Sequence, residues 1–223
     1  MTNRTLVVSI DALITADIPV LKQLPNLGRV MEHASWITDI ECIYPTLTYP
    51  CHATIATGCW PDRTGINNNE IPDFFAKGRM DWYWWREAIQ VPTVVDFARQ
   101  AGLTASTVTW PVMCASGAEY NIGEIWAPRE EDDPTPWFTR ANSPAVAKIF
   151  EANKHMLRWM KTPQMDEFAA KCAADIIRAH RPDLMLLHLS YVDHQRHRLA
   201  AWRTQILCCW ATTVSSTATR CSI

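Results

Sequence analysis

Apolar residues gather in two short, nearly continuous runs that each lead to an aspartate. Leu6–Ile10 precedes Asp11, and Leu184–Leu189 reaches Asp193 through three further residues. Runs that are apolar at nearly every position are typical of strands buried on both faces, as in a parallel sheet. A third strand is predicted over Ala105–Trp110.

Helical spacing of apolar residues separates these runs. One helix is predicted around Leu27 and Val30, a second after Pro92-Thr93, and a third from Ser143-Pro144, where Ser would be the N-cap. A fourth places Met165, Phe168, Ala169, Cys172, Ile176 and Ile177 on one face and ends at 181–183. Strands that alternate with helices favour an α/β fold with a parallel sheet and helices on both faces.

Residues 111–142 and 199–223 do not follow this pattern. The first segment holds Pro128, Pro134, Pro136 and an acidic run over 130–133, which predicts a long, solvated loop. The second contains no Gly, Pro, Asp, Glu or Lys and no clear periodicity. We therefore interpret 1–198 as the N-terminal part of one domain and 199–223 as an atypical tail. A shifted reading frame, a truncated gene or an unusual natural segment would each explain it.

Composition excludes several classes of function. The 223 residues carry 21 Lys and Arg against 23 Asp and Glu, a net charge of -2, so nucleic-acid binding is not expected. No run of about 18 apolar residues predicts a membrane span, and no signal peptide is evident, which favours a cytoplasmic protein. The eight cysteines are scattered without a CxxC pair, which indicates buried thiols rather than disulfides or a cysteine zinc site.

The candidate chemistry lies where the strands end. Ligand sites in open α/β sheets form beyond the carboxyl ends of the strands, so Asp11 and Asp193 are expected to converge there. Two converging carboxylates need a compensating cation, and the nearby His197 favours a metal, since Asp and His are both zinc ligands. Taken singly, a strand-ending Asp is more often a turn or cap residue, and a lone His is more often a surface or hydrogen-bonded residue than a ligand. Thr48 alone would be an ordinary helix N-cap.

The context of Thr48 carries a resemblance. The segment 44–54 reads YPTLTYPCHAT and is followed by Thr57-Gly58, Pro61-Asp62-Arg63, Gly65-Ile66 and Asn69. Together with Val8-Ser9-Ile10-Asp11, Leu24-Pro25-Asn26-Leu27 and Pro182-Asp183-Leu184, it resembles the nucleotide pyrophosphatase/phosphodiesterase family of the alkaline phosphatase superfamily. The resemblance covers roughly residues 5 to 198 and is most specific from Thr48 to Asn69.

The resemblance implies an alkaline-phosphatase-like α/β/α sandwich with a mainly parallel sheet, acting on a small phosphodiester or nucleotide by means of two zinc ions. Thr48 would be the nucleophile and Asn69 a donor to a phosphate oxygen. Asp11 and Thr48 would bind one metal, and Asp193 and His197 the other. Metal coordination activates a hydroxyl, two metals stabilise an in-line displacement, and a helix N-terminus favours the anionic phosphate.

The sequence also departs from the family pattern. Ala12 replaces a usual Gly and Cys51 a usual Asn. The later Asp-His pair and final His that complete the two metal sites have no counterpart after His197. The C-terminal part of the domain is thus expected to be missing, and the chain to have little activity. The alternatives are an inactive product, or a phosphomonoesterase, phosphotransferase or sulfatase-like activity.

Two further groups of side chains are left open or given a structural role. Trp82, Trp84, Trp85 and Trp110 would either stack on a nucleobase or pack in the core. His52, His188 and His194 are interpreted as structural.

Overall fold

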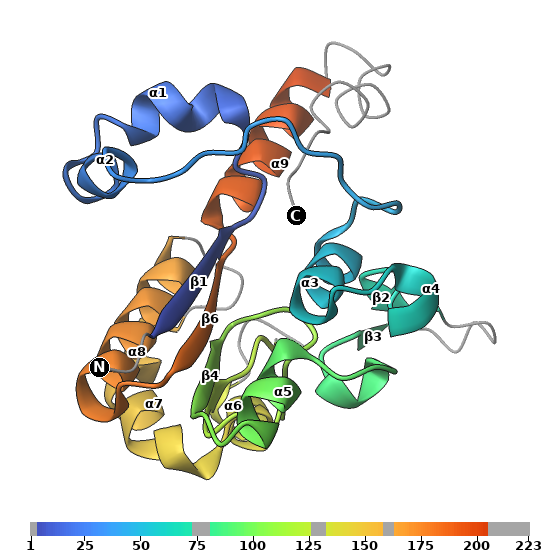
Figure 1. Cartoon of the computed structure of the whole chain (residues 1–223), viewed down its shortest axis with the longest axis vertical. Coiled ribbons are helices and arrows are strands. Elements are labelled where there is room, and N and C mark those ends of the chain that lie inside the picture. Colours follow the sequence, from blue (N-terminus) through green and yellow to red (C-terminus); the bar gives the residue numbers. More distant parts are fainter. Residues whose placement is uncertain (1–3, 73–80, 126–132, 158–162, 205–223) are drawn as a thin grey trace.

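The computed structural model describes residues 4–72, 81–125, 133–157 and 163–204. Its main sheet has the strand order β1-β6-β4-β5, and every neighbouring pair is parallel (Figure 1). The strands are β1 (Thr5–Ile10), β4 (Ala105–Val108), β5 (Tyr120–Ile122) and β6 (Leu184–Leu189). A small antiparallel sheet pairs β2 (Glu70–Ile71) with β3 (Asp81–Trp82). The predicted α/β class with a parallel sheet is confirmed.

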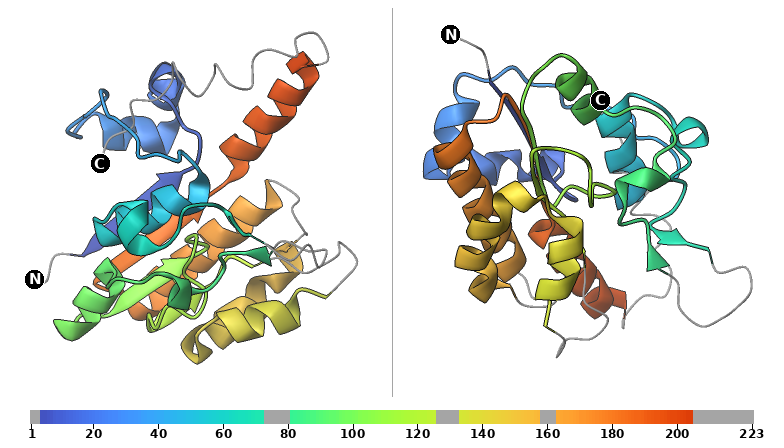
Figure 2. Two further views of the ribbon diagram at one scale, coloured as in Figure 1. Left: turned by 90° about the vertical axis from the view of Figure 1, so that its right-hand side faces the viewer. Right: turned by 90° about the horizontal axis from the view of Figure 1, so that it is seen from below.

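Helices cover both faces of the main sheet (Figure 2), with α8 and α7 on one side and α3 and α5 on the other. The helices are α1 (Ile18–Leu21), α2 (Pro25–Met31), α3 (Thr48–Thr57), α4 (Pro61–Thr64), α5 (Val94–Gln100), α6 (Thr135–Ala141), α7 (Ala147–Asn153), α8 (Gln164–His180) and α9 (Tyr191–Thr204). Short 3₁₀ helices span Thr15–Asp17, Arg86–Ala88, Pro144–Val146 and Lys154–Met156. No helix within the described ranges is long and apolar enough to cross a membrane.

A well-packed part of the core lies under α8. Its predicted apolar face is buried, apart from the more exposed Ile177. Phe168 meets Phe138 and Phe150 edge to face, with ring centroids 5.9 and 6.2 Å apart. The helix ends at Arg181, which adopts the left-handed conformation with φ 49°. These contacts join α6, α7 and α8 into one layer against the sheet.

The expectation that the first strand is buried on both faces is wrong. Among the described residues β1 pairs only with β6, and Leu6 and Val8 are 51% and 44% exposed. Side chains alternate along a strand, so Val7 packs against the core while Leu6 and Val8 share the open face. The physical reason is position: α8 covers the inner strands, and β1 is the sheet edge.

The long loop predicted over 111–142 is also corrected, because it contains β5 and α6. The strand escaped detection because Asn121 is polar yet buried, its amide bonded to Thr107 Oγ1 and to the carbonyl of Ala141. Pro134 and Pro136 occupy the N-cap and first turn of α6, where proline is tolerated, and so do not break the helix. Most of the acidic run lies outside the described residues, and Asp133 is exposed.

Three smaller boundaries differ from the prediction. The strand from Ala105 ends at Val108, and Thr109 turns with φ 49°. Ser143 does not cap a helix, since its hydroxyl donates to Glu119 O, and a 3₁₀ turn precedes α7. The helix that begins at Tyr191 runs through Thr204, five residues beyond the start of the segment predicted to lack a helix at Leu199. Residues 205–223 of that segment lie outside the described residues.

Candidate active site

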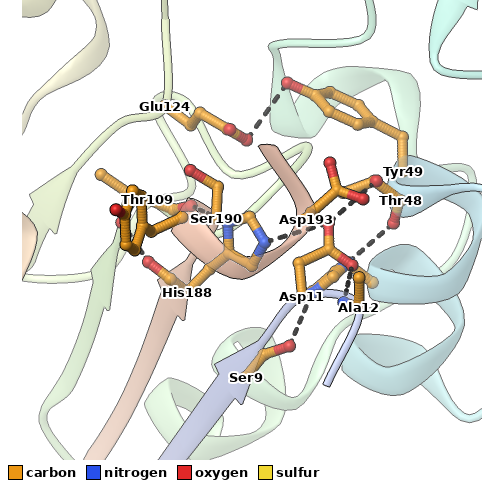
Figure 3. A network of polar contacts seen from close by, with 12 residues as sticks. Ser9, Asp11, Ala12, Thr48, Tyr49, Thr109, Glu124, His188, Ser190 and Asp193 are labelled. Atoms are coloured by element: carbon orange, nitrogen blue, oxygen red, sulfur yellow. Dashed lines mark hydrogen bonds and ion pairs between the residues drawn. The ribbon is translucent and has the colours of Figure 1, made fainter. Parts of the chain in front are cut away.

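The site forms where β1 meets the start of α3 (Figure 3). Asp11 follows β1 directly, and Thr48 is the first residue of α3. Thr48 Oγ1 donates a hydrogen bond of 3.0 Å to Asp11 Oδ2, and the Ala12 amide donates 3.0 Å to Oδ1. Burial alone would raise the pKa of Asp11, but His188, His52 and the Thr48 hydroxyl outweigh it and lower the pKa to about 2. Asp11 is therefore a carboxylate at neutral pH.

His52 links α3 to β1 next to the contact between Thr48 and Asp11. One ring nitrogen, Nδ1, lies 2.7 Å from the carbonyl of Thr48, and Nε2 lies 2.8 Å from Ser9 Oγ. Burial and the neighbouring His188 lower the pKa of His52 to about 3, so the ring is neutral. The predicted structural role of His52 agrees with these contacts, because the ring holds Thr48 in register with Asp11.

Asn69 lies beside the first turn of α3. Its Oδ1 accepts a 2.9 Å hydrogen bond from the Tyr49 amide, which leaves the amide Nδ2 as the donor end of the side chain. The turn itself offers fewer donors than expected, since Pro50 has no N–H and the Cys51 amide bonds to Leu47 O. An anion here would rely on Asn69, the Thr48 amide and the helix dipole.

Asp193 and His197 lie on α9, which begins two residues after β6 ends, and not at the end of the strand as expected. Both lie on one side of the helix, with Asp193 Oδ1 3.4 Å from His197 Nε2. Burial and the charge of Asp11 raise the pKa of Asp193, as expected for two carboxylates that converge.

The start of α9 is held by a carboxylate from another helix. Asp166 of α8 accepts hydrogen bonds from the Ser190 and Tyr191 amides at 2.9 and 3.0 Å. These are orphan donors of a helix N-terminus, which an external acid satisfies here. Asp166 thereby fixes where Asp193 lies.

The side chain of His188, on β6, also lies beside Asp11. It is 2% exposed, Nδ1 lies 3.1 Å from Thr109 O, and Nε2 lies 3.6 Å from Asp11 Oδ2. Burial would lower the pKa of His188, but the carboxylates of Asp11 and Glu124 outweigh this and raise it. The sequence gives no sign of this proximity, because it depends on the register that sets Ile10 opposite Leu189.

Glu124 is a second residue that the sequence analysis missed. It is buried, and its Oε2 accepts a 3.1 Å hydrogen bond from the Tyr49 hydroxyl. Burial raises the pKa of Glu124 to about 7 and raises that of Tyr49 above its ordinary value. The charges of His188 and Asp11 both act on Glu124, so it belongs to the same electrostatic network.

The tryptophans divide between core and edge. Trp110 and Trp84 are buried, and the indole of Trp110 donates to His52 O at 3.3 Å. Trp82 stacks on Trp84 at 5.6 Å and is only half-buried, and Trp85 lies against Arg140. The core interpretation thus fits Trp84 and Trp110.

The cysteines follow the expectation of buried thiols only in part. Cys114 and Cys172 are buried, whereas Cys42, Cys51 and Cys59 are half-buried. The Sγ atoms of Cys42 and Cys51 lie 3.6 Å apart. Cys208, Cys209 and Cys221 lie outside the described residues.

The predicted site residues therefore come together without forming a complete metal cluster. Asp11, Thr48 and Asp193 lie side by side in Figure 3, Asn69 joins them through Tyr49, and His197 joins through Asp193. Within the described ranges, no group of three or more His, Cys, Asp or Glu side chains is arranged to hold a metal ion. The donor types nevertheless suit a divalent cation, because two carboxylates meet beside a hydroxyl and an imidazole nitrogen.

Known proteins match both the sequence and the fold. Residues 5–212 match the type I phosphodiesterase / nucleotide pyrophosphatase family. Venom phosphodiesterase 2 of Crotalus adamanteus is 25% identical over 185 residues, which cover 78% of this chain and 18% of that protein. Human bis(5'-adenosyl)-triphosphatase is 27% identical over 114 residues, 48% of this chain and 24% of that protein. The chain thus spans less than a quarter of the length of these relatives.

Solved structures share the fold at low identity. A phosphonoacetate hydrolase from Sinorhizobium meliloti 1021 superposes with a TM-score of 0.61 at 19% identity, covering 86% of this chain and 48% of that one. An inactive form of murine ectonucleotide pyrophosphatase/phosphodiesterase 5 in complex with AMP gives 0.52 at 18% identity, covering 87% and 45%. With the family match over most of its length, the chain belongs to the type I phosphodiesterase / nucleotide pyrophosphatase family.

Proposed function

We propose that this chain carries a site for metal-dependent hydrolysis of phosphodiester or pyrophosphate bonds in small nucleotide-type substrates, with Thr48 as the nucleophile. The observation that carries the proposal is the 3.0 Å contact between Thr48 Oγ1, at the N-terminus of α3, and Asp11 Oδ2. A hydroxyl that only capped its helix would bond to an amide of its own first turn instead.

Each residue has a distinct role in this proposal. Thr48 Oγ1 attacks phosphorus, the leaving oxygen departs on the opposite side, and water then hydrolyses the phosphothreonine. Asn69 donates from Nδ2 to a phosphate oxygen while Tyr49 N holds its Oδ1. The positive end of the α3 dipole favours the anionic phosphate.

Two divalent ions, proposed to be zinc, fit the donor set: Asp11 and Thr48 would hold one, and Asp193 and His197 the other. Bound ions would lower the pKa of the hydroxyl and neutralise charge on the phosphate. The two carboxylates are already close enough for Asp11 to raise the pKa of Asp193, which is the repulsion that a cation relieves.

The relatives support a nucleotide-type substrate. The matched proteins include a venom phosphodiesterase and a bis(5'-adenosyl)-triphosphatase, and a protein of similar fold was solved with AMP. The half-buried ring of Trp82, which stacks on the buried Trp84, offers a partly exposed aromatic surface.

The test is turnover of a chromogenic nucleotide phosphodiester by the 223-residue chain in excess zinc, with AMP binding measured in parallel by calorimetry. We expect Thr48→Ala to abolish turnover while zinc binding by Asp193 and His197 remains. Asn69→Ala should weaken zinc-dependent AMP binding by about tenfold or more, as for a lost donor to a charged group.

Thr57→Ala is the matched control, because Thr57 is a half-buried threonine at the far end of the same helix, bonded to Ala53 O. The Thr57→Ala variant should be less stable than the wild type but bind AMP with the same affinity. Unchanged turnover in Thr48→Ala would show that Thr48 is only structural. AMP binding that needs neither zinc nor Asn69 would contradict the proposed metal-dependent site.

A further inference from the structure

Two hydrogen bonds to Thr109 fix His188, one through its imidazole ring and one through its backbone carbonyl. Its Nδ1 lies 3.1 Å from the carbonyl of Thr109, while Thr109 Oγ1 donates 2.8 Å to the carbonyl of His188. A carbonyl oxygen can only accept, so Nδ1 carries a proton. In the neutral ring the lone pair is therefore on Nε2.

That lone pair faces a carboxylate. Nε2 of His188 lies 3.6 Å from Asp11 Oδ2, too far for a hydrogen bond, and within the described part of the chain it is buried without a hydrogen-bond partner. Two electron-rich atoms that face each other in a buried place repel unless a cation lies between them. The cation is either a proton on Nε2 or a metal ion.

The spacing suits a metal. Two ligands on one tetrahedral zinc, with bonds of about 2.1 Å, lie about 3.4 Å apart. The pair Nε2–Oδ2 measures 3.6 Å, and Thr48 Oγ1 lies 3.0 Å from the same Oδ2. Metal-ligating histidines also commonly donate their second ring N–H to a backbone carbonyl, as Nδ1 does to Thr109 O.

We propose that Nε2 of His188 is a further ligand of the divalent cation held by Asp11 and Thr48. This inference rests on the proposed function and adds a third protein donor, from β6, to a site that would otherwise have two. It assigns a function to a histidine that the sequence pattern marks only as part of a buried strand.

The test follows zinc at the ring nitrogens of the ¹⁵N-labelled full chain by long-range ¹H–¹⁵N correlation spectra. We expect the Nδ1–H of His188 to be kept and its Nε2 to lose any proton and change its signal when zinc is added. An imidazolium pattern that zinc leaves unchanged overturns the proposal, because the cation would then be a proton. The signals of His188 are assigned from His188→Gln or, if that variant does not fold, by elimination with Gln variants of the other six histidines.

Zinc affinity gives an independent readout. His188→Gln should weaken zinc binding at least about tenfold, since even residues that merely orient ligands cost 10- to 100-fold when lost. His33→Gln is the matched control, because His33 is exposed and lies outside the site. Equal affinities in the two variants overturn the proposal.

The two levels of inference fail differently. If the wild-type chain binds no zinc, the proposed metal-dependent function fails. A second outcome is that the wild type binds zinc, Asp11→Asn loses it and His188→Gln keeps it. In that case only the role of His188 is wrong.

Discussion

The segment from β1 to the loop before α3, residues 4–43, packs very differently from the layer of α6, α7 and α8. Val30 and Ile37 are 63% and 74% exposed in the first, whereas Phe168 in the second has no exposed surface. Yet Asp11 belongs to the first region, and His188 and Glu124 belong to the well-packed strands and loops. The site is therefore assembled across the boundary between a well-packed and a weakly packed part of one domain.

Polar contacts, rather than apolar burial, hold the weakly packed segment in place. Ser9 bonds to His52, and Asp17 accepts from Arg196 of α9 at 2.8 and 2.6 Å. Both bonds come from Nη2 of Arg196, and such charge-assisted hydrogen bonds are stronger than neutral ones. These bonds fix the position of Asp11 while adding little burial.

The largest expected effect contrasts one apolar truncation in each region. Phe168→Ala should lower the free energy of unfolding by about 3–5 kcal/mol, because it removes a buried ring with two aromatic neighbours. Leu6→Ala should cost about 1 kcal/mol or less, since Leu6 is already half exposed. Urea unfolding followed by tryptophan fluorescence measures both. Similar losses would show that β1 belongs to the cooperative core as much as α8 does.

The second prediction concerns pH and the buried carboxyl of Glu124, whose pKa is about 7 against an ordinary 4.5. Between those values the folded chain holds a proton that the unfolded chain releases, so stability falls as pH rises. The total loss is about 3 kcal/mol. Glu124→Gln should remove this slope. Unfolding at pH 5, 6, 7 and 8 measures it, and parallel slopes in both proteins would contradict the raised pKa.

The protonation of His52 changes the stability with pH in the direction opposite to that of Glu124. The pKa of His52 is about 3 in the folded chain against an ordinary 6.5, so the unfolded state binds more protons between these values. Stability therefore falls as pH decreases through that window. Because this contribution is present in both the wild type and Glu124→Gln, the difference between their profiles isolates Glu124.

The smallest expected effect lies beside the site, at Ala12, whose φ is 57°. A left-handed conformation strains a residue with a Cβ, so Ala12→Gly should raise the free energy of unfolding by about 0.5–1 kcal/mol. Ala53→Gly, in the helical interior of α3, is the control and should lower it by about 1 kcal/mol or more. Thermal unfolding compares the two. A loss in Ala12→Gly as large as in the control would show that φ at this position carries no strain.

The sequence pattern was informative where burial decides the structure, on one face of α8 and on both faces of β6. It could not reveal β5, because Asn121 is buried by virtue of its bonds to Thr107 and Ala141, which come from distant segments. The convergence of Asp11 and Asp193 could be predicted from where strands end. The approach of His188 and Glu124 could not, since it depends on side-chain directions set by neighbouring strands.

The parallel register of β1 against β6 restricts how this site can change in evolution. Ile10 lies opposite Leu189, and Asp11 follows at once, bonded through its amide to Leu189 O. A slip of one residue would carry every side chain of β1 to the other face of the sheet. The loops that separate Asp11, Thr48 and Asp193 can lengthen or shorten between descendants, whereas insertions and deletions within these two strands should be eliminated by selection.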